Sequence, residues 1–461
     1  MSITSQQIQA RGAGGTERDV PRASVLDTLR VGALVLVPAI ARGVLARRPK
    51  VVALAEAVDA DRHAGRLLQG LRARYGPGPL RLAVPGRSLA MVLTPGDVER
   101  ILTGSPEPFA AANREKRKAL EHFQPHGVLA SHGAERADRR RFNEEVLDTP
   151  HEVHCLGSAI SRKVHEEAAE LLASVDRSGA LDWDSFRIAW WRVIRRVVLG
   201  DAARDDDEIS DLLTTLRMNA NWSFAHPRRD RVRERFQRRL REHLARAEPG
   251  SLAELVARTP KTDMTEPADQ VPQWLFAFEP AGMAAFRALA VLAARPVAAG
   301  PARDEIDGLD LSAPQDLPYL RSCVQESVRL WPTTMAVLRD STTETEWAGR
   351  RLPAGTGLII YTPFLQRDEQ NLPYADDFAP GAWLDGTAEA DWSAIPFSGG
   401  PVECPGRNLV LLVTSLFLGA LLQGHDFRPD GGRHLGEGAP LPRTLSPFRL
   451  RFAVSRMPVK V

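Results

Sequence analysis

The sequence predicts a mainly α protein with small β-sheets, and three observations carry that prediction. Helical periodicity dominates from about residue 114 to residue 294 of a chain of 461 residues. Short alternating patterns that are typical of strands lie near both ends of the chain. The strands do not alternate with helices in βαβ fashion, which argues against a doubly wound nucleotide-binding fold.

The expected elements follow one another in a simple order. An amphipathic helix at residues 67–75 precedes two strands at residues 80–84 and 89–93, which Pro85-Gly86-Arg87 joins as a turn. The long helical region comes next, and we expect it to break at Pro125, Pro150, Gly200, Pro227 and Pro249. Short strand patterns at residues 346–360 and 449–454 complete the chain.

The chain is expected to form one domain behind a short tail. Residues 1–22 are polar and rich in Gly, Gln and Arg, so they predict a disordered N-terminal tail. Residues 23–461 contain no internal repeat and no Gly/Ser/Pro-rich seam, which favours a single domain. Residues 31–40 are the most membrane-like stretch, but about 20 apolar residues are needed to span a bilayer. We therefore expect a helix that packs on the body of the protein, and no membrane association.

Charge and cysteine content exclude several classes of protein. The chain has 60 Lys and Arg against 58 Asp and Glu, and this balance argues against a nucleic-acid binder. The Arg-rich segment 228–246 is expected to be a solvated surface helix that buries Phe236, Leu240 and Leu244. Three widely spaced cysteines exclude a disulfide scaffold and favour a reducing, cytoplasmic setting. His151, His154 and Cys155 are only a weak metal-site pattern, since no fourth ligand is evident.

The most informative segment is residues 397–408, Phe-Ser-Gly-Gly-Pro-Val-Glu-Cys-Pro-Gly-Arg-Asn, which directly precedes an apolar helical run. Gly400 and Gly406 allow positive φ angles and a close approach of the backbone to a flat ligand. Pro405 suits the first turn of a helix, so Cys404 is expected at a helix N-terminus. The helix dipole favours a thiolate there, and a thiolate held in this way is a metal ligand or a nucleophile.

This segment resembles the haem-binding loop of the cytochrome P-450 (haem-thiolate) family. Phe397, Gly400, Cys404 and Gly406 match all four fixed positions of that loop. Upstream, Glu326 and Arg329 share a helix face and resemble the family's buried structural pair. The resemblance covers nearly the whole chain after residue 22. It implies a soluble bacterial member with the triangular, helix-rich cytochrome P-450 fold, and haem b (iron protoporphyrin IX) held by the Cys404 thiolate.

The same resemblance implies roles for further residues. Arg136, Arg140 and Arg339 occupy positions that reach the haem propionates, a task that suits the planar guanidinium fork. Substrate-contacting positions combine apolar walls with a few hydrogen-bonding groups, as a pocket for a mid-sized organic molecule requires. They are His126, Trp222, Phe278, Thr334, Met335, Val337 and Phe448, and for His126 a surface loop position is the alternative.

Two positions near the loop depart from the family pattern. Val402 stands where a His or Arg often contacts a propionate, so one charged contact is missing. Ala382 stands where an Arg usually joins the Glu–Arg pair, so another residue or water must complete that network.

A third departure concerns the long helix that the family places over the haem. That helix normally carries an acid and then an alcohol, which organise water and deliver protons. Here no Ser or Thr occurs between Glu266 and Leu311. One register places Glu279 at the acid and Pro280 at the alcohol, and an alternative register places Ala285 at the alcohol. Pro280 is expected to distort the helix and free a carbonyl for water. Glu279 is the candidate proton relay, unless it faces away and pairs with a cation.

Three functions stay open at this point. The first is a secondary-metabolite tailoring monooxygenase that uses dioxygen, with electrons from a separate ferredoxin and ferredoxin reductase. The second is an atypical member that performs peroxide-driven oxidation, oxidative coupling, cyclisation or rearrangement, all of which need less from the missing alcohol. The third is a haem-binding paralogue without catalysis. A monomer acting on a small molecule is expected in each of the first two.

Overall fold

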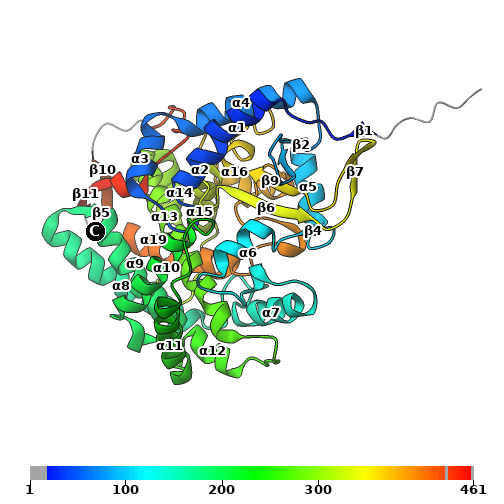
Figure 1. The fold of residues 1–461 in the computed structure, drawn as a ribbon. Helices are drawn as coiled ribbons and strands as arrows, with labels where there is room; N and C mark the ends of the chain where they lie inside the picture. Colours follow the sequence, from blue (N-terminus) through cyan, green and yellow to red (C-terminus); the bar gives the residue numbers. More distant parts are fainter. Residues whose placement is uncertain (1–17, 431–434, 458–461) are drawn as a thin grey trace, which may run out of the picture.

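The computed structural model describes residues 18–430 and 435–457, and its helices dominate the fold (Figure 1). The N-terminal part contributes α1 (Val25–Val31), a π-helical segment (Gly32–Leu36), α2 (Val37–Ala41), α3 (Pro49–Ala57), α4 (Ala60–Tyr75), α5 (Pro95–Thr103), α6 (Arg114–Leu120) and α7 (Gly133–Val146). The middle contributes α8 (Gly157–Ser178), α9 (Trp183–Leu199), the 3-10 turn η3 (Asp201–Ala203), α10 (Asp207–Ala220), α11 (Asp230–Arg246), α12 (Leu252–Arg258) and α13 (Pro267–Ala294). The remainder is α14 (Pro296–Ile306), α15 (Pro318–Leu330), α16 (Thr362–Leu365), α17 (Gly381–Leu384), α18 (Thr387–Ala390) and α19 (Arg407–Leu422).

Three small sheets complete the fold, as the alternating patterns predict. The largest has the order β2-β3-β9-β6-β4, from strands Leu80–Arg81, Leu89–Val92, Gly357–Tyr361, Ala336–Ser341 and Phe109–Ala110. The second has the order β10-β11-β5, from His425–Pro429, Arg451–Arg456 and Ala180–Asp182, and the third β1-β8-β7, from Arg18–Asp19, Arg350–Leu352 and Thr345–Trp347. The predicted hairpin is confirmed, with Leu80 opposite Met91 in an antiparallel pair. It joins parts of the chain that are far apart, since β3 pairs in parallel with β9.

The helical core is built around α13 and α19, which lie in the middle of the molecule (Figure 1). Both helices are apolar around most of their circumference, which is the pattern of a helix that is buried on all sides. Every residue of α19 from Leu409 to Leu422 is buried. In the described part of the chain, α13 is the one helix long and apolar enough to cross a membrane, and it is mostly buried within the protein.

The N-terminal segment differs in part from expectation. Residues 1–17 of the predicted tail lie outside the described residues. Residues 18–22 do not behave as a tail, because β1 pairs with β8 and Val20 is buried. The membrane-like stretch forms a helix on the body of the protein, as predicted, with Val31 and Val35 facing inward. Its other face leaves several apolar side chains exposed, among them Val25, Leu29, Val37 and Ile40.

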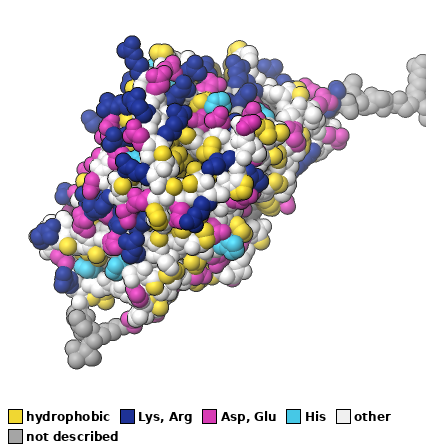
Figure 2. Space-filling model, turned by 90° about the horizontal axis from the view of Figure 1, so that it is seen from below, with side chains coloured by type: hydrophobic (Ala, Val, Ile, Leu, Met, Phe, Trp, Pro, Cys, Tyr) yellow, Lys and Arg dark blue, Asp and Glu magenta, His cyan; other side chains and the backbone are white. Residues whose placement is uncertain are grey.

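The Arg-rich helix is confirmed as a surface helix. In α11, Phe236 and Leu240 are fully buried and Leu244 packs against the same core. The charged side chains cover the outside, and Figure 2 shows basic and acidic groups interspersed on the side of the molecule seen from below. A surface of mixed sign is what a solvated helix requires, and it offers no single-sign track for a nucleic acid.

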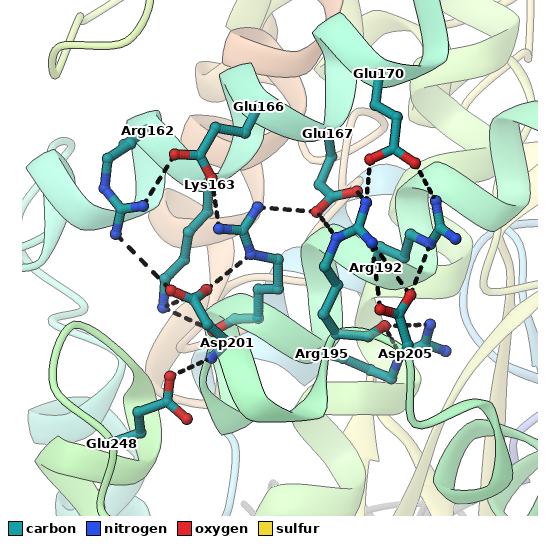
Figure 3. A network of polar contacts seen from close by, with 12 residues as sticks. Arg162, Lys163, Glu166, Glu167, Glu170, Arg192, Arg195, Asp201, Asp205 and Glu248 are labelled. Carbon is teal, nitrogen blue, oxygen red and sulfur yellow. Dashed lines mark hydrogen bonds and ion pairs between the residues drawn. The ribbon is translucent and has the colours of Figure 1, made fainter. Parts of the chain in front are cut away.

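Ion pairs tie α8 to α9 and to η3 (Figure 3). At the centre of this network is the buried carboxylate of Glu167, which accepts from Arg196 at 2.8 Å and from Arg204 at 2.6 Å. The fully buried Lys163 donates to the carbonyls of Arg196 and Gly250 at 2.9 and 2.7 Å. The network fixes how these helices sit against the core and takes no part in the site described next.

Candidate functional site

The cysteine loop folds back on itself directly before α19. The backbone N–H of Cys404 donates to the carbonyl of Phe397 at 3.0 Å, which closes the loop. Gly400 has a φ of 65°, and a Cβ there would lie 2.3 Å from the carbonyl oxygen of Leu102 in α5. This position therefore requires glycine, as predicted.

Two details of the predicted loop are wrong. The φ of Gly406 is −93°, so this residue does not use the left-handed region. Gly406 is the N-cap of α19, so Pro405 and Cys404 precede the helix instead of opening it. Gly406 nevertheless presents its backbone N–H to the cysteine sulfur.

The Cys404 thiol lies deep in the protein, yet part of its residue surface is still accessible. Burial raises the pKa of this thiol, while the N–H of Gly406 and the charge of Arg140 act in the opposite direction. A bound metal ion would reverse the balance, because a coordinating thiol is deprotonated outright. A metal ion bound to the sulfur would therefore hold this residue as a thiolate.

Three cations lie near one another beside the loop without acidic partners among the described residues. Arg339 is buried and donates to the hydroxyls of Ser105 at 3.0 Å and of Ser398, in the loop, at 3.3 Å. Burial, with the charge of Arg136, lowers the pKa of Arg339 to about 10. Burial, with the charge of Arg339, lowers the pKa of Lys116 in α6 to about 7. This excess of positive charge requires an anion to stabilise it.

Arg140 and Arg136 make different contacts, although both lie on α7. Arg140 donates to the backbone carbonyl of Glu403 at 2.6 Å and pairs with Glu144, so it holds the cysteine loop itself. Arg136 is half-buried, and its pKa is lowered by burial and by the charge of Arg140. Arg136 and Arg339 therefore lie where they would meet an acidic ligand, whereas Arg140 braces the backbone next to Cys404.

The Glu326–Arg329 pair is buried, as predicted. The two side chains are 0% exposed and join through two hydrogen bonds of 2.6 and 2.7 Å. Trp383 completes the network by donating its indole N–H to Glu326 at 2.9 Å. It stands next to Ala382, so a neighbouring side chain replaces the arginine that the family pattern would supply.

One face of α13 is partly accessible in the middle of an otherwise buried helix. Its members are spaced three and four residues apart, as the positions of one helix face must be, and they are Gln273, Phe276, Ala277 and Pro280. Gly282 lies elsewhere, because a Cβ on it would lie 2.5 Å from the indole nitrogen of Trp190 in α9. Ala285 is fully buried. The open face thus carries Pro280, whereas Ala285 of the alternative register does not lie on it.

Glu279 forms an ion pair with Arg217 of α10. Arg217 is 2% exposed, and its guanidinium also lies 4.4 Å from the ring centroid of Phe276. The carboxylate of Glu279 keeps 18% exposure. Pairing with a cation was the alternative to the proton relay, and the pair is present. Since Glu279 neighbours the open face, a relay through the pair stays a proposal.

The predicted substrate residues divide into two groups. Met335 and Phe448 line one small cavity together with Thr333 and Met283 of α13, and Thr334 is exposed beside them. The others lie elsewhere. Phe278 packs against Trp190, Val337 belongs to the core of the largest sheet, Trp222 is covered by Arg48, and His126 is exposed, with its backbone held by Asp269 and Gln270.

Asp148 joins the weak metal pattern in space, but the group does not form a metal site. Asp148, His154 and Cys155 bring their ligand atoms within 4.8 Å of one another. Both ring nitrogens of His154 are already used, one by the N–H of Leu156 at 3.0 Å and one by the carbonyl of Val146 at 3.2 Å. His151 contacts Asp148 and points to solvent. The group is therefore a hydrogen-bonded turn between α7 and α8.

The residues around Cys404 fit a haem. A flat metal complex that bears carboxylates suits three features of the site. They are a sulfur that a backbone N–H approaches, a close backbone approach at Gly400, and, within the described chain, cations without acidic partners at Lys116, Arg136 and Arg339. Cys404 would hold the iron, and the three cations would hold the carboxylates. The sequence analysis did not identify Lys116 or Trp383. For Trp383 the available signal was an aromatic side chain with an N–H group directly after Ala382, and for Lys116 the local sequence offered none.

Comparison with known proteins supports this assignment. Residues 286–437 match the model of the family described as cytochrome P450. Cyclooctat-9-en-7-ol 5-monooxygenase of Streptomyces melanosporofaciens is 33% identical over 126 residues, which cover 26% of this chain and 28% of that protein. Cyclooctatin synthase of the same organism is 31% identical over 136 residues, 29% of this chain and 30% of that protein. A probable mitochondrial cytochrome P450 12c1 of Drosophila melanogaster is 33% identical over 120 residues, which cover 24% of this chain and 23% of that protein.

The sequence matches thus span about a quarter to a third of those relatives, whereas the fold matches span almost the whole chain. The structure of a cytochrome P450 named CYP102L1 superposes with a TM-score of 0.70 at 18% identity, over 96% of this chain and 99% of that one. The retinoic-acid-bound cyanobacterial CYP120A1 superposes with a TM-score of 0.68 at 18% identity, over 85% and 95%. These structures show the fold.

Proposed function

We propose that this chain is a cytochrome P450 and acts as a haem-thiolate oxidoreductase that oxidises a mid-sized organic molecule. The observation that carries the proposal is the pairing of the Cys404 loop with the uncompensated cations Lys116, Arg136 and Arg339. When bound, the haem supplies the oxidising chemistry, and the protein supplies orientation and electrostatics. Glu326, Arg329 and Trp383 brace the fold next to it.

The specific activity that we propose is secondary-metabolite tailoring by a monooxygenase of the soluble bacterial type. Two Streptomyces relatives support it, one of which is named a monooxygenase. Such an enzyme would take electrons from a separate ferredoxin and its reductase, and would act as a cytoplasmic monomer. In this proposal Glu279 and water near Pro280 hold and move the proton that the alcohol would otherwise handle, because Pro280 leaves the carbonyl of Phe276 without its usual helical donor.

A second candidate is favoured by one observation on α13. Its open face presents Phe276, Ala277 and Pro280 and carries no hydroxyl group. Glu279 is held by Arg217. A helix that offers so little for proton delivery suits peroxide-driven oxidation, oxidative coupling, cyclisation or rearrangement. A haem-binding paralogue without catalysis is the outcome if neither oxidant supports turnover.

Isotopically labelled dioxygen distinguishes these candidates. The purified protein would be supplied with ferredoxin, its reductase and a nicotinamide cofactor, or with peroxide alone. Labelled oxygen in the product, dependent on the electron donors, supports the monooxygenase. Efficient turnover with peroxide, combined with no turnover on dioxygen and the electron donors, supports the second candidate and contradicts the first.

A further inference from the structure

A small cavity lies beside the open face of α13, and four arginines reach it. Its apolar walls come from Val52, Met283, Trp331, Met335 and Phe448, and its basic residues are Arg42, Arg47, Arg287 and Arg443. Its volume is about 30 Å³, on a scale where one water molecule needs roughly 10–15 Å³. A carboxylate group fits such a space, and a ring does not.

Two of these arginines have carboxylate partners. Arg42 pairs with Asp61 at 2.7 Å, and Asp61 also accepts from the hydroxyls of Tyr361 and Thr444. Arg443 pairs with Asp376 at 2.9 Å. The charges of Arg42 and Arg443 are therefore paired, and Asp61, the acid that lines the cavity, is satisfied.

Arg47 and Arg287 have no carboxylate partner among the residues that the structure describes. Arg287 is 8% exposed and donates to the carbonyls of Leu445 at 2.8 Å and Trp331 at 3.1 Å. Arg47 donates to the carbonyls of Gly43 at 2.8 Å and of Thr333. Each guanidinium has five N–H donors, so both keep donors for a further acceptor.

Electrostatics agrees with this geometry. Burial, together with mutual repulsion between Arg47 and Arg287, lowers the pKa of Arg287 to about 9. Burial, with the charge of Arg42, lowers the pKa of Arg47 to about 10. The nearby carboxylate of Glu279 is already paired with Arg217. The charges of Glu56 and Asp61 partly offset this repulsion at Arg287, and an added anion between the two arginines would offset it further.

The cavity and the open face of α13 share one side of that helix. Pro280, Met283 and Arg287 are spaced three and four residues apart, so they form one stripe. Arg287 lies seven residues beyond Pro280, which at 1.5 Å per residue is about 10 Å along the axis. A molecule held at Arg287 would have to span about 10 Å of this stripe to reach Pro280.

We propose that Arg47 and Arg287 form a carboxylate subsite, so that the substrate is an organic acid anchored by its anionic end. The inference rests on the proposed function for the reaction that the bound acid undergoes. Binding of the acid itself rests on the cavity alone. Charge-assisted, bidentate contacts of this kind are the strong ones in proteins, because they combine Coulomb attraction with fixed geometry.

The test uses the purified full chain and titration calorimetry, which reports binding whether or not haem is present. The probes are dodecanoate, long enough to cover 10 Å of helix, and its methyl ester, which has the same chain and no charge. The variant is Arg47→Gln, and the matched control is Arg48→Gln. Arg48 is the neighbouring arginine, but its guanidinium lies over the ring of Trp222, 4.5 Å from the centroid, and outside the cavity.

Dodecanoate is expected to bind at least about tenfold more tightly than the ester, and Arg47→Gln is expected to remove most of that preference. Arg48→Gln should keep it. Equal binding of acid and ester by the unmodified protein, or an unchanged preference in Arg47→Gln, would overturn the proposal. Arg287→Lys is the conservative variant at the second position, because it retains the charge and disturbs the fold less than a neutral side chain would. It should bind the acid with intermediate affinity.

The absorption spectrum of the same samples separates this inference from the proposed function. A charge-dependent preference for dodecanoate in protein that shows no thiolate-bound haem would keep the subsite and reject the haem-thiolate function. A normal haem-thiolate spectrum with no preference for the acid would reject the subsite and keep the function.

Discussion

The environment of Lys116 favours the binding of an anionic ligand. Burial lowers its pKa to about 7, far below the ordinary value of about 10.4 for lysine. Its neighbours Arg339 and Arg136 add to the effect. A lysine that the fold holds in this way is unfavourable unless an anion joins it, which is why we assign it to a haem carboxylate.

This assignment predicts an unusual pH dependence for the haem-free protein. The unfolded chain keeps Lys116 protonated up to about pH 10, whereas the folded chain loses the proton near pH 7. Because the unfolded state binds more protons between these values, the free energy of unfolding should rise with pH from about 7 to about 10. Urea denaturation at several pH values measures it, and Lys116→Met should flatten the slope. An identical slope in both proteins would contradict the assignment.

Glu279 predicts a stability effect that can be separated from catalysis. Glu279→Gln would leave Arg217, which is 2% exposed, without its counterion. Removing one partner of a buried pair costs about 3–5 kcal/mol, and the accessible side of Glu279 puts the expected loss at the low end of that range. Adding Arg217→Met should restore much of the loss in chemical denaturation.

Turnover of the same Glu279→Gln variant tests the proton relay. If Glu279 moves protons, dioxygen-dependent turnover should fall while peroxide-driven turnover changes little. Unchanged dioxygen-dependent turnover in a folded variant would end the relay proposal.

Several residue assignments followed from the sequence, and others required the structure. The spacing of the loop and of the Glu–Arg pair was specific enough for the sequence to predict the turn at Gly400 and the buried pair of Glu326 and Arg329. The role of Cys404 as a metal ligand stays a prediction. The partner of Glu279, the role of Trp383 and the charge of Lys116 depend on contacts between segments more than 50 residues apart in the chain, which local patterns do not record.

At the scale of elements, the contact between α8 and α9 depends on one buried carboxylate. Glu167 is 2% exposed and joins Arg196 and Arg204, whereas Glu170, one helical turn away, is 56% exposed (Figure 3). Glu167→Gln should cost about 1–3 kcal/mol of unfolding free energy, because it weakens two buried charge-assisted contacts, although Arg196 keeps Glu166 and Asp201 as partners. Glu170→Gln should cost less than about 1 kcal/mol. Similar losses in both variants would show that burial does not govern this network.

Helix α13 shows what patterns predict of an element and what they do not. The family resemblance predicted a long helix here, and Pro280 predicted a distortion in it. The helix runs without interruption from Pro267 to Ala294 with Pro272 and Pro280 inside. Which face stays open could not be predicted, because that depends on Trp190 of α9 filling the space beside Gly282.

At the scale of the whole molecule, Asp61 links parts of the chain that are far apart in sequence. It lies in α4, pairs with Arg42 near α2, and accepts from Tyr361 in β9 and from Thr444 near the C-terminus. Burial opposes its ionisation, but Arg42 and the hydrogen bonds outweigh burial and lower its pKa.

Asp61 therefore predicts a contribution to acid stability. A carboxyl group whose pKa is lower in the folded state stabilises the protein above the unfolded value, about 3.9, and this stabilisation is lost as the pH falls through the folded value. Asp61→Asn should have a lower melting temperature than the unmodified protein at pH 7. The difference between the two melting temperatures should be smaller at pH 3 to 4. A difference that does not depend on pH would contradict this reasoning.

The overall fold was predictable because its helices and the hairpin are locally encoded, and because the loop around Cys404 resembles a known family. The attachment of residues 18–20 was not, since it depends on the pairing of β1 with β8, which lies about 330 residues further along the chain. The carboxylate subsite likewise joins residues from four distant segments.

The central claim is that Cys404 holds a haem iron as a thiolate, and the absorption spectrum of the reduced protein with carbon monoxide tests it most directly. The account predicts the strongly red-shifted Soret band of a thiolate-ligated haem in the unmodified protein, and its loss in Cys404→Ser. Failure to retain haem, or the same red-shifted band in Cys404→Ser, would contradict it.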